Sequence, residues 1–495
     1  MQDARSTERS SLMRTSLLGL VLGPVAGVCV YLIPIPHLTP PAHTLAAILT
    51  WVVINWIAEP IPLPMTALLG TAFCVLAGLG SAKSIFASYG HPIIFLFIGS
   101  FLIAESMVVH GVDRKVAEWM LSLSWVGTRP SRILFTLGAI TALMSMWISN
   151  TAATAMMLPI GLGVLRTLRR RNADRDRYQT ACMLMLSYAA TAGGMATIVG
   201  TPPNLIGVGL IAEQAGVTIS FVTWMAVGLP LALAMLLCAW FLLDRLHLPH
   251  EAEATPATDA IPTREPAGWT HGQINACIAF SVAVVLWIVP GVLEALLGST
   301  HGFIVWLNAR LPNELVALLA AGLLFILPTD VRTGTFTLQW KQTANINWGI
   351  ILLFGGGLAF GDLMSKTGLS DAVGTGFVTL VGPNDIWGLT AVAIVAGVLT
   401  SELASNTASA SMLIPLVIAI AHADGVSPIA PALGACLGAS LGFALPVSTP
   451  PNAIVYGTGL VPMRSMIRAG VLFDLIGAIL IWATLRVVCP LVGLT

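Results

Sequence analysis

Apolar segments long enough to cross a lipid bilayer recur along the whole chain. A transmembrane helix needs about 20 consecutive apolar residues. Only 9% of the 495 residues are charged, whereas a soluble domain carries about 25%. The segments are also too long and too uniformly apolar for barrel strands. The sequence therefore predicts an all-α polytopic membrane protein with eleven spans, near residues 16–35, 43–58, 63–82, 92–109, 181–212, 218–243, 273–295, 313–329, 347–364, 428–460 and 469–492.

A short polar motif occurs once in each half of this apolar chain. "SNTAATAMMLPI" (149–160) and "SNTASASMLIPL" (405–416) share six of twelve positions. Each motif lies between two apolar arms that are shorter than a span. We expect each pair of arms to form a re-entrant hairpin, over 130–165 and over 386–421, with Ser-Asn-Thr at its tip.

The repeat extends on both sides of these hairpins. "PIIFLFIGSFLIAESMVVHG" (92–111) aligns with "GIILLFGGGLAFGDLMSKTG" (349–368), and "VGTPPNLIGVG" (199–209) aligns with "VSTPPNAIVYG" (447–457). Each half thus contains a span, a hairpin, and a helix broken at Thr-Pro-Pro-Asn. The predicted organisation is a cytoplasmic N-terminal tail, a first repeat with broken helix 181–212, a linker, and a second repeat with broken helix 428–460, over residues 1–15, 16–243, 244–272 and 273–495.

The charges of the loops indicate that the two repeats have opposite orientations. The loop after the first hairpin, "RTLRRRNADRDRY", is rich in arginine, whereas "HADGVSPIA" after the second has none. Basic residues favour the cytoplasmic side, so these loops are expected on opposite faces, as in many secondary transporters. With a cytoplasmic N-terminus, the 23 Lys and Arg residues lie on the cytoplasmic side except Lys83, Arg310, Lys366 and Arg486. Residues 113–123 are expected to form an amphipathic helix at the membrane surface.

The two Ser-Asn-Thr tips supply groups that attract an anion. Serine and asparagine are good helix N-caps. The helix that follows each tip directs free backbone N–H groups and the positive end of its dipole toward the tip. Two tips that enter from opposite sides would share one cavity, which suits an anion with two separated carboxylates.

The Thr-Pro-Pro-Asn breaks supply groups that attract a cation. Proline removes a backbone donor and discourages helix, so carbonyl oxygens are left free. Ser145 precedes Ser149 by four residues, as Ser401 precedes Ser405, which places both hydroxyls on one face of a hairpin arm. Each half is therefore expected to form one Na+ site beside one half of the anion site.

Other readings of the polar residues carry less weight. Small polar residues in membrane helices can serve only close packing, but twinned triplets and twinned breaks favour a site. Among carboxylates in or near spans, Glu105 and Asp362 are expected to be structural, Glu59 to end the second span, and Glu402 to influence the site. The seven cysteines form no CxxC pair and the nine histidines no HExxH motif, so no zinc site or disulfide is expected. Zero net charge gives no indication of a nucleic-acid partner.

Four linked motifs resemble those of the divalent anion:sodium symporter family, which includes the bacterial INDY-type dicarboxylate transporters. They are "SMWISNTAATAMMLP", "GTPPN", "SELASNTASASMLIP" and "STPPNAIV", in that order. The resemblance covers nearly the whole chain except the tail and the linker. It implies a homodimer in the plasma (inner) membrane, with a scaffold domain at the dimer contact and a transport domain that moves as an elevator.

The resemblance also implies which residues bind the ions and the substrate. Sodium would be bound by Ser145, Ser149, Asn150 and the Gly200 carbonyl in the first half, and by Ser401, Ala404, Asn406 and Ser448 in the second. Substrate carboxylates would meet Ser149, Asn150, Thr151, Ser405, Asn406, Thr407, Thr449 and Pro450. Relatives often have threonine at the position of Ser401 and alanine at that of Ser448. The first change keeps the hydroxyl, and the second leaves the backbone carbonyl.

The expected function is Na+-driven import of a small divalent anion, a four-carbon dicarboxylate such as succinate, malate or fumarate. A sodium-independent dicarboxylate exchanger and a passive anion channel remain alternatives. No base–nucleophile pair or zinc motif lies at the hairpins, so an enzyme is not expected. No arginine lies near either triplet to clamp a carboxylate, which leaves sulfate, citrate or an oxo-acid open as substrates, and also the number of coupled ions.

Overall fold

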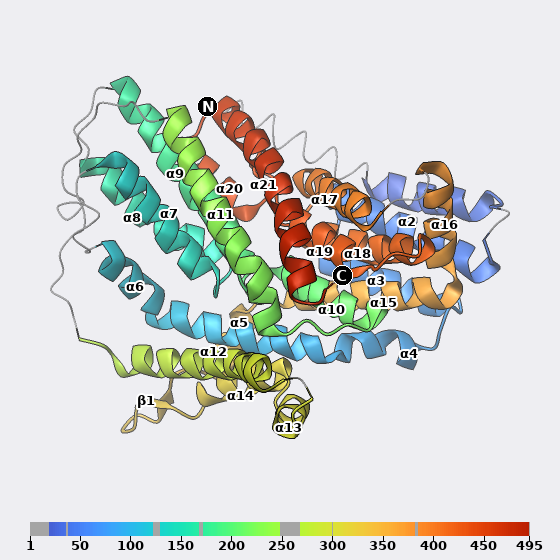
Figure 1. Ribbon diagram of the computed structural model, residues 1–495, viewed down its shortest axis with the longest axis horizontal. Coiled ribbons are helices and arrows are strands. Elements are labelled where there is room, and N and C mark those ends of the chain that lie inside the picture. Colours follow the sequence, from blue (N-terminus) through green and yellow to red (C-terminus); the bar gives the residue numbers. More distant parts are fainter. Residues whose placement is uncertain are drawn as a thin grey trace.

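The structure, a computed structural model, describes residues 19–35, 38–121, 129–167, 172–247, 268–298, 300–381 and 385–494. These ranges are almost entirely helical (Figure 1). The expected N-terminal tail (1–15) and most of the expected linker (244–272) lie outside the described residues. The all-α polytopic architecture predicted from the sequence is confirmed.

The first half begins with a helix over Gly19–Leu32, and a series of further helices follows it. The series is α2 (Pro40–Ala58), α3 (Leu63–Leu76), α4 (Ala82–Phe86), the 3-10 turn η1 (Ala87–Gly90), α5 (Pro92–His110), α6 (Val112–Leu121), α7 (Pro130–Ser145), α8 (Asn150–Thr167), α9 (Asn172–Gly194), α10 (Pro202–Ala215) and α11 (Phe221–His247). Helices α7 and α8 coincide with the hairpin expected over 130–165, and α6 with the expected amphipathic helix.

The second half ends with the same order of helices as α5 to α11 and also contains a two-stranded ribbon. It contains α12 (His271–Leu297), α13 (Gly302–Arg310), α14 (Asn313–Leu323), β1 (Pro328–Asp330), β2 (Thr335–Phe336), η3 (Trp340–Asn345), α15 (Trp348–Thr367), α16 (Leu369–Val381), α17 (Ile386–Leu403), α18 (Asn406–Ala423), α19 (Ile429–Gly438), α20 (Pro450–Gly457) and α21 (Met463–Leu491). Helices α17 and α18 coincide with the hairpin expected over 386–421.

The boundaries differ from the expected eleven spans in several places. Within the described ranges, eight helices are long and apolar enough to cross a membrane alone, or nine if α13 and α14, bent by 57°, form one span. Helices α3, α10, α19 and α20 are too short to count, and α9, although 23 residues long, is not apolar enough. The expected span 313–329 is wrong at its end, because helix stops at Leu323 and Pro328 opens the antiparallel ribbon of β1 and β2. Proline has no N–H to donate within a helix.

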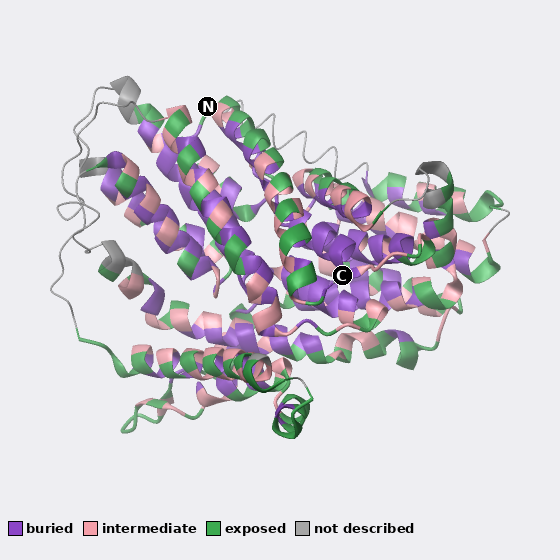
Figure 2. Cartoon of the chain, in the orientation of Figure 1, coloured by how far each residue is buried: buried purple, intermediate pink, exposed green. Residues whose placement is uncertain are grey.

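The most completely buried stretches are residues 180–201 and 429–444, which lead into the unwound breaks, together with most of α10; they are purple in Figure 2. Helix α7 packs against α9, and α17 packs against α19. Small residues permit this close approach. A β-carbon on Gly193 would lie 2.2 Å from the carbonyl oxygen of Ala142, so only glycine fits there. Tight packing of hairpin arm on broken helix therefore fixes where each tip lies.

The last helix of each half makes the same contact with its hairpin. The indole Nε1 of Trp240 donates a hydrogen bond to the backbone oxygen of Ser131 over 3.0 Å, and Nε1 of Trp482 donates to that of Trp387 over 3.0 Å.

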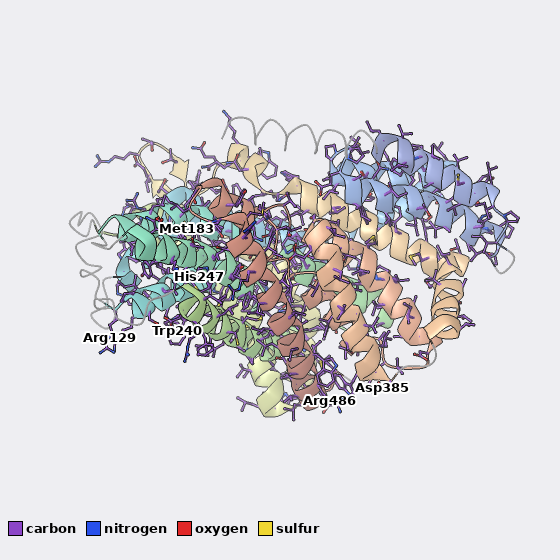
Figure 3. All side chains as sticks on the ribbon, turned by 90° about the horizontal axis from the view of Figure 1, so that it is seen from above. Arg129, Met183, Trp240, His247, Asp385 and Arg486 are labelled. Carbon is purple, nitrogen blue, oxygen red and sulfur yellow. The ribbon has the colours of Figure 1, made fainter. Side chains whose placement is uncertain are left out.

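Figure 3 shows Trp240 toward the left of the molecule, together with Arg129 and His247, whereas Asp385 and Arg486 lie toward the right. The two hairpins thus start toward opposite sides of the molecule in this view.

Candidate functional site

The tip of the first hairpin connects α7 to α8. At the end of α7, the buried Ser145 hydroxyl donates a hydrogen bond to Oδ1 of Asn150, the first residue of α8, over 2.8 Å. Ser149 Oγ accepts from the backbone N–H of Ala152 over 3.2 Å and so caps α8. Ser149 and Thr151 are exposed and Asn150 is half-buried. The triplet therefore presents its side chains at the positive end of a helix.

The tip of the second hairpin repeats the same hydrogen bond. Ser401 Oγ donates to Oδ1 of Asn406 over 2.8 Å and also lies 2.9 Å from the carbonyl oxygen of Ala439. The Asn406 side-chain amide donates to the carbonyl oxygen of Ser440 over 3.2 Å. The second triplet is more enclosed than the first, with Thr407 buried and Ser405 half-buried. The fold thus brings Ser145 next to Asn150 and Ser401 next to Asn406.

Two asparagines that the site prediction omitted hold the broken helices in shape. The Asn204 amide donates to the carbonyl oxygens of Gly194 and Thr197, over 2.9 and 2.8 Å. The Asn452 amide donates to those of Gly442 and Leu445, both over 2.9 Å. Each bond spans the unwound residues between α9 and α10 or between α19 and α20. Both asparagines are the last residue of a Thr-Pro-Pro-Asn motif, and this repeated position is the sequence feature that could have identified them.

Of the residues expected to bind the first Na+, Ser145, Asn150 and Gly200 lie at the break after α9. A β-carbon on Gly194 would lie 2.3 Å from Asn150 Oδ1, and one on Gly200 would lie 2.4 Å from the carbonyl oxygen of Gly194. Ser145 reaches the same place through its bond to Asn150. The hydroxyl, the amide oxygen and the backbone oxygens of the break therefore lie together. Unwound backbone carbonyls of this kind coordinate Na+ in transporters.

Of the residues expected to bind the second Na+, Ser401, Asn406 and Ser448 lie at the break after α19. Gly442 has a φ of +156° and lies against Ser401 Oγ and Ser448 Cβ. The Ser448 hydroxyl turns away and donates to Oε2 of Glu402 over 2.6 Å, so its carbonyl is the group left for a cation. Ala404, in the turn before the triplet, is buried and extended. Glu402, selected from the sequence for its position, thus contacts the site directly.

The two halves contribute to one another's surroundings. Helix α8 packs against α20, and α18 packs against α10. The expected substrate residues Thr449 and Pro450 lie at the start of α20. They therefore belong to the helix that packs against α8, the second arm of the first hairpin. The Thr449 hydroxyl accepts from the backbone N–H of Asn452 over 3.4 Å. The groups that were expected to bind substrate therefore come from both halves.

The other intramembrane acids make local contacts away from the tips. Glu105 accepts from the side-chain amide of Asn345 over 2.9 Å. Asp362 pairs with Lys366, one turn along α15, over 2.7 Å. Glu59 ends α2 in a left-handed conformation, with φ of 46°. These contacts agree with the structural roles expected of Glu105 and Asp362 and with the expectation that Glu59 ends the second span.

Within the described residues, no group of three or more His, Cys, Asp and Glu side chains could hold a metal ion. The ligands available at the two tips are instead neutral hydroxyl, amide and backbone oxygens. In transporters, unwound backbone carbonyls coordinate Na+ and helix N-termini point at anionic groups of the substrate. The geometry thus suits simultaneous, reversible binding of cations and an anion.

The chain matches one protein family over almost its entire length, that of the sodium:sulfate symporter transmembrane region, at residues 14–493. It is 30% identical over 500 residues to the sodium-dependent dicarboxylate transporter SdcS of Staphylococcus aureus strain USA300, covering 99% of this chain and 94% of that protein. The same protein from strain NCTC 8325 gives the same identity and coverage.

Two solved structures share the fold at low sequence identity. The YdaH transporter of Alcanivorax borkumensis has a TM-score of 0.55 and 14% identity, over 96% of this chain and 97% of that one. MtrF of Neisseria gonorrhoeae has a TM-score of 0.54 and 11% identity, over 96% and 94%. Both are transporters, and the likeness concerns the arrangement of their helices.

Proposed function

The chain belongs to the sodium:sulfate symporter family, and from this premise we propose that it imports a four-carbon dicarboxylate such as succinate, malate or fumarate together with Na+. The choice of dicarboxylate follows the similarity to SdcS. The observation that carries the proposal is the repeated hydrogen bond of Ser145 to Asn150 and of Ser401 to Asn406. Each asparagine stands at the junction of a helix N-terminus and an unwound break.

In this proposal each asparagine serves both ligands. One Na+ is held by Ser145, Ser149, Asn150 and the Gly200 carbonyl, and a second by Ser401, Asn406 and the carbonyls of Ala404 and Ser448. The substrate carboxylates are bound by the Ser-Asn-Thr triplets, at 149–151 and 405–407, with Thr449 and Pro450. Bound Na+ offsets the charge of the anion, because no arginine lies near the triplets. Binding of one ligand therefore favours binding of the other.

Transport requires the site to face each side of the membrane in turn. We propose an elevator movement of the hairpins and broken helices against a scaffold in a homodimer, with a cytoplasmic N-terminus in the plasma (inner) membrane. The opposite placement of Arg129 and Asp385, where the two hairpins start, supports an inverted relation of the halves (Figure 3). The different charges of the two loops after the hairpins support it independently.

Uptake into proteoliposomes tests the proposal. Purified protein is reconstituted, and labelled succinate is supplied outside with an inward gradient of NaCl or of choline chloride. Accumulation above the external concentration, only with NaCl, is expected. Equal uptake with choline, dependent on internal dicarboxylate, would indicate an exchanger, and uptake that stops at equilibration would indicate a channel. Competition by unlabelled malate, fumarate, citrate and sulfate then defines the substrate class.

A further inference from the structure

Two carboxyl groups meet inside the protein behind the second hairpin tip. Glu402 lies near the end of α17, and Asp474 lies on α21 with only 5% of its surface exposed. The two carboxyl groups are within hydrogen-bonding reach of one another. Ionised carboxylates only accept hydrogen bonds, so a contact between two of them requires positive charge between them.

The protein groups around this pair are neutral donors. Glu402 accepts from the backbone N–H of Ala444 over 2.8 Å and from the Ser448 hydroxyl over 2.6 Å. Asp474 Oδ2 accepts from the backbone N–H of Phe443 over 3.4 Å. Over the described ranges, neither carboxylate forms an ion pair with a lysine, arginine or histidine. The side chains and backbone described here thus supply no full positive charge.

Two further oxygen atoms are available beside the pair. Among the described residues, Asp474 Oδ1 and the Tyr188 hydroxyl have no hydrogen-bond donor or acceptor. Tyr188, on α9, is completely buried and close enough to both carboxyl groups for their charges to act on its hydroxyl. Its ring is held by stacking on Phe473, at 5.0 Å between centroids. A buried hydroxyl without a partner is rare, because leaving it unpaired costs about 1–3 kcal/mol.

This cluster breaks the symmetry of the repeat. By the register that pairs Ser145 with Ser401, the counterpart of Glu402 is Met146. By the register that pairs Trp240 with Trp482, the counterpart of Asp474 is Ala232. The first half therefore has no equivalent carboxyl at either position, although its Ser–Asn hydrogen bond at the tip is the same. The acids are an addition to the second half, beyond what either Ser–Asn pair needs.

We propose that Glu402 and Asp474, with the Tyr188 hydroxyl, form a third cation site that binds one Na+ during transport. The inference rests on the proposed function and adds an ion to it. A Na+ ion needs several oxygen ligands, and the cluster offers two carboxylates and a phenol oxygen, whereas a shared proton would engage only two of these atoms. Through Ser448 the site adjoins the second Na+ site. Its occupation ties α17, the break after α19, and α21 together.

The stoichiometry gives the test. A dianion carried with the two Na+ ions of the twin sites moves no net charge, and one more Na+ makes uptake electrogenic. In proteoliposomes, wild-type uptake of succinate should accelerate when a potassium–valinomycin potential makes the interior negative. In Asp474→Asn this acceleration should be lost, and the Hill coefficient for Na+ should fall by about one. Asp362→Asn, which removes a carboxyl from a surface ion pair, should keep both properties.

A binding measurement covers the case in which the variant does not transport. Thermal stability of detergent-purified protein is titrated with NaCl against choline chloride, without substrate, since a ligand bound only by the folded state raises stability. Asp474→Asn and Glu402→Gln should each show a weaker dependence on Na+ than the wild type, because an amide can donate to the remaining carboxylate without a cation.

Three outcomes would overturn the site while leaving the proposed function intact. Asp474→Asn could keep the electrogenic uptake and the wild-type Hill coefficient. Both variants could keep the wild-type stabilisation by NaCl. The variant could instead lose a proton influx coupled to succinate, measured with an internal pH dye, with an unchanged dependence on Na+. The last result would assign a shared proton to the pair. Absence of Na+-dependent uptake in the wild type would refute the proposed function itself.

Discussion

Ser187 on α9 donates a hydrogen bond to Oδ1 of Asn452 on α20 over 2.5 Å, and both side chains are completely or almost completely buried. This bond joins the first half of the chain to the break of the second half. Asn452 uses its amide to hold that break and its oxygen to accept from Ser187. The shape of the second cation site thus depends on a residue of the opposite repeat.

Removal of this hydroxyl tests the link between the halves. Ser187→Ala should lower stability by about 1–3 kcal/mol, because Asn452 Oδ1 is left buried without a donor. Uptake of succinate should fall as the break loosens. Thermal midpoints and initial rates are the measurements, with Ser281→Ala on the exposed face of α12 as the control. A variant as stable and active as the control would show that the bond contributes nothing.

The two break asparagines should differ in how much stability they supply. Asn452→Ala loses two donated bonds and the bond from Ser187, whereas Asn204→Ala loses only two, since no described donor reaches Asn204 Oδ1. At about 1 kcal/mol for each bond, Asn452→Ala should melt lower. Thermal melts of both variants in the same detergent decide this. The opposite order would contradict the assignment of these bonds.

The triplet asparagines should be needed for transport more than for folding. Asn150→Ala and Asn406→Ala should each nearly abolish succinate uptake, because each side chain is proposed to bind Na+ and substrate together. Size-exclusion profiles should still be those of folded protein. Asn308→Ala, at an exposed position of α13, serves as the control. Normal uptake by either triplet variant would refute the twin-site arrangement.

The pH dependence of uptake should follow the charge of the substrate. If the dianion is carried, raising the pH from about 5.5 to about 7.5 at fixed total succinate should increase uptake, because the second carboxyl loses its proton over that range. No histidine lies near either triplet to oppose this trend. Initial rates at constant Na+ measure it. Uptake that declines across the interval would indicate the monoanion or coupling to protons.

Thiol labelling should place the two hairpins on opposite sides of the membrane. In a cysteine-free parent, Asp174→Cys near the start of α9 should react with an impermeant reagent only from the cytoplasmic face. Asp424→Cys, at the C-cap of α18, should react only from outside. The Lys and Arg content of the two loops gives this direction. Reaction of both positions from one side would exclude the inverted repeat.

Much of the scaffold of the site could be predicted from the sequence. The twin motifs located both hairpins within a few residues, and Pro202 and Pro450 located the restart of each broken helix, because proline fits the first turn of a helix. These features are local and therefore visible in the sequence. The ribbon of β1 and β2 was missed because its residues follow an apolar run without a clear alternating pattern.

Contacts between distant elements were not available from the sequence. Asp474 lies in the middle of an apolar helix 72 positions after Glu402, and only the packing of α21 against α17 brings the two carboxyls together. The hydrogen bond from Ser187 to Asn452 depends in the same way on how α9 and α20 pack. Such pairs arise from the tertiary arrangement, which motif spacing does not encode.

The packing of α8 against α20 has a consequence for how the chain is made. Helix α20 begins 300 residues after α8, and at about 5–20 residues per second a ribosome needs on the order of 15–60 s to synthesise that interval. During that time the first Ser-Asn-Thr tip has no opposite half to cover it. A polar tip in hydrocarbon is costly, so the nascent hairpin must wait at the water interface or beside the insertion machinery until the second repeat arrives.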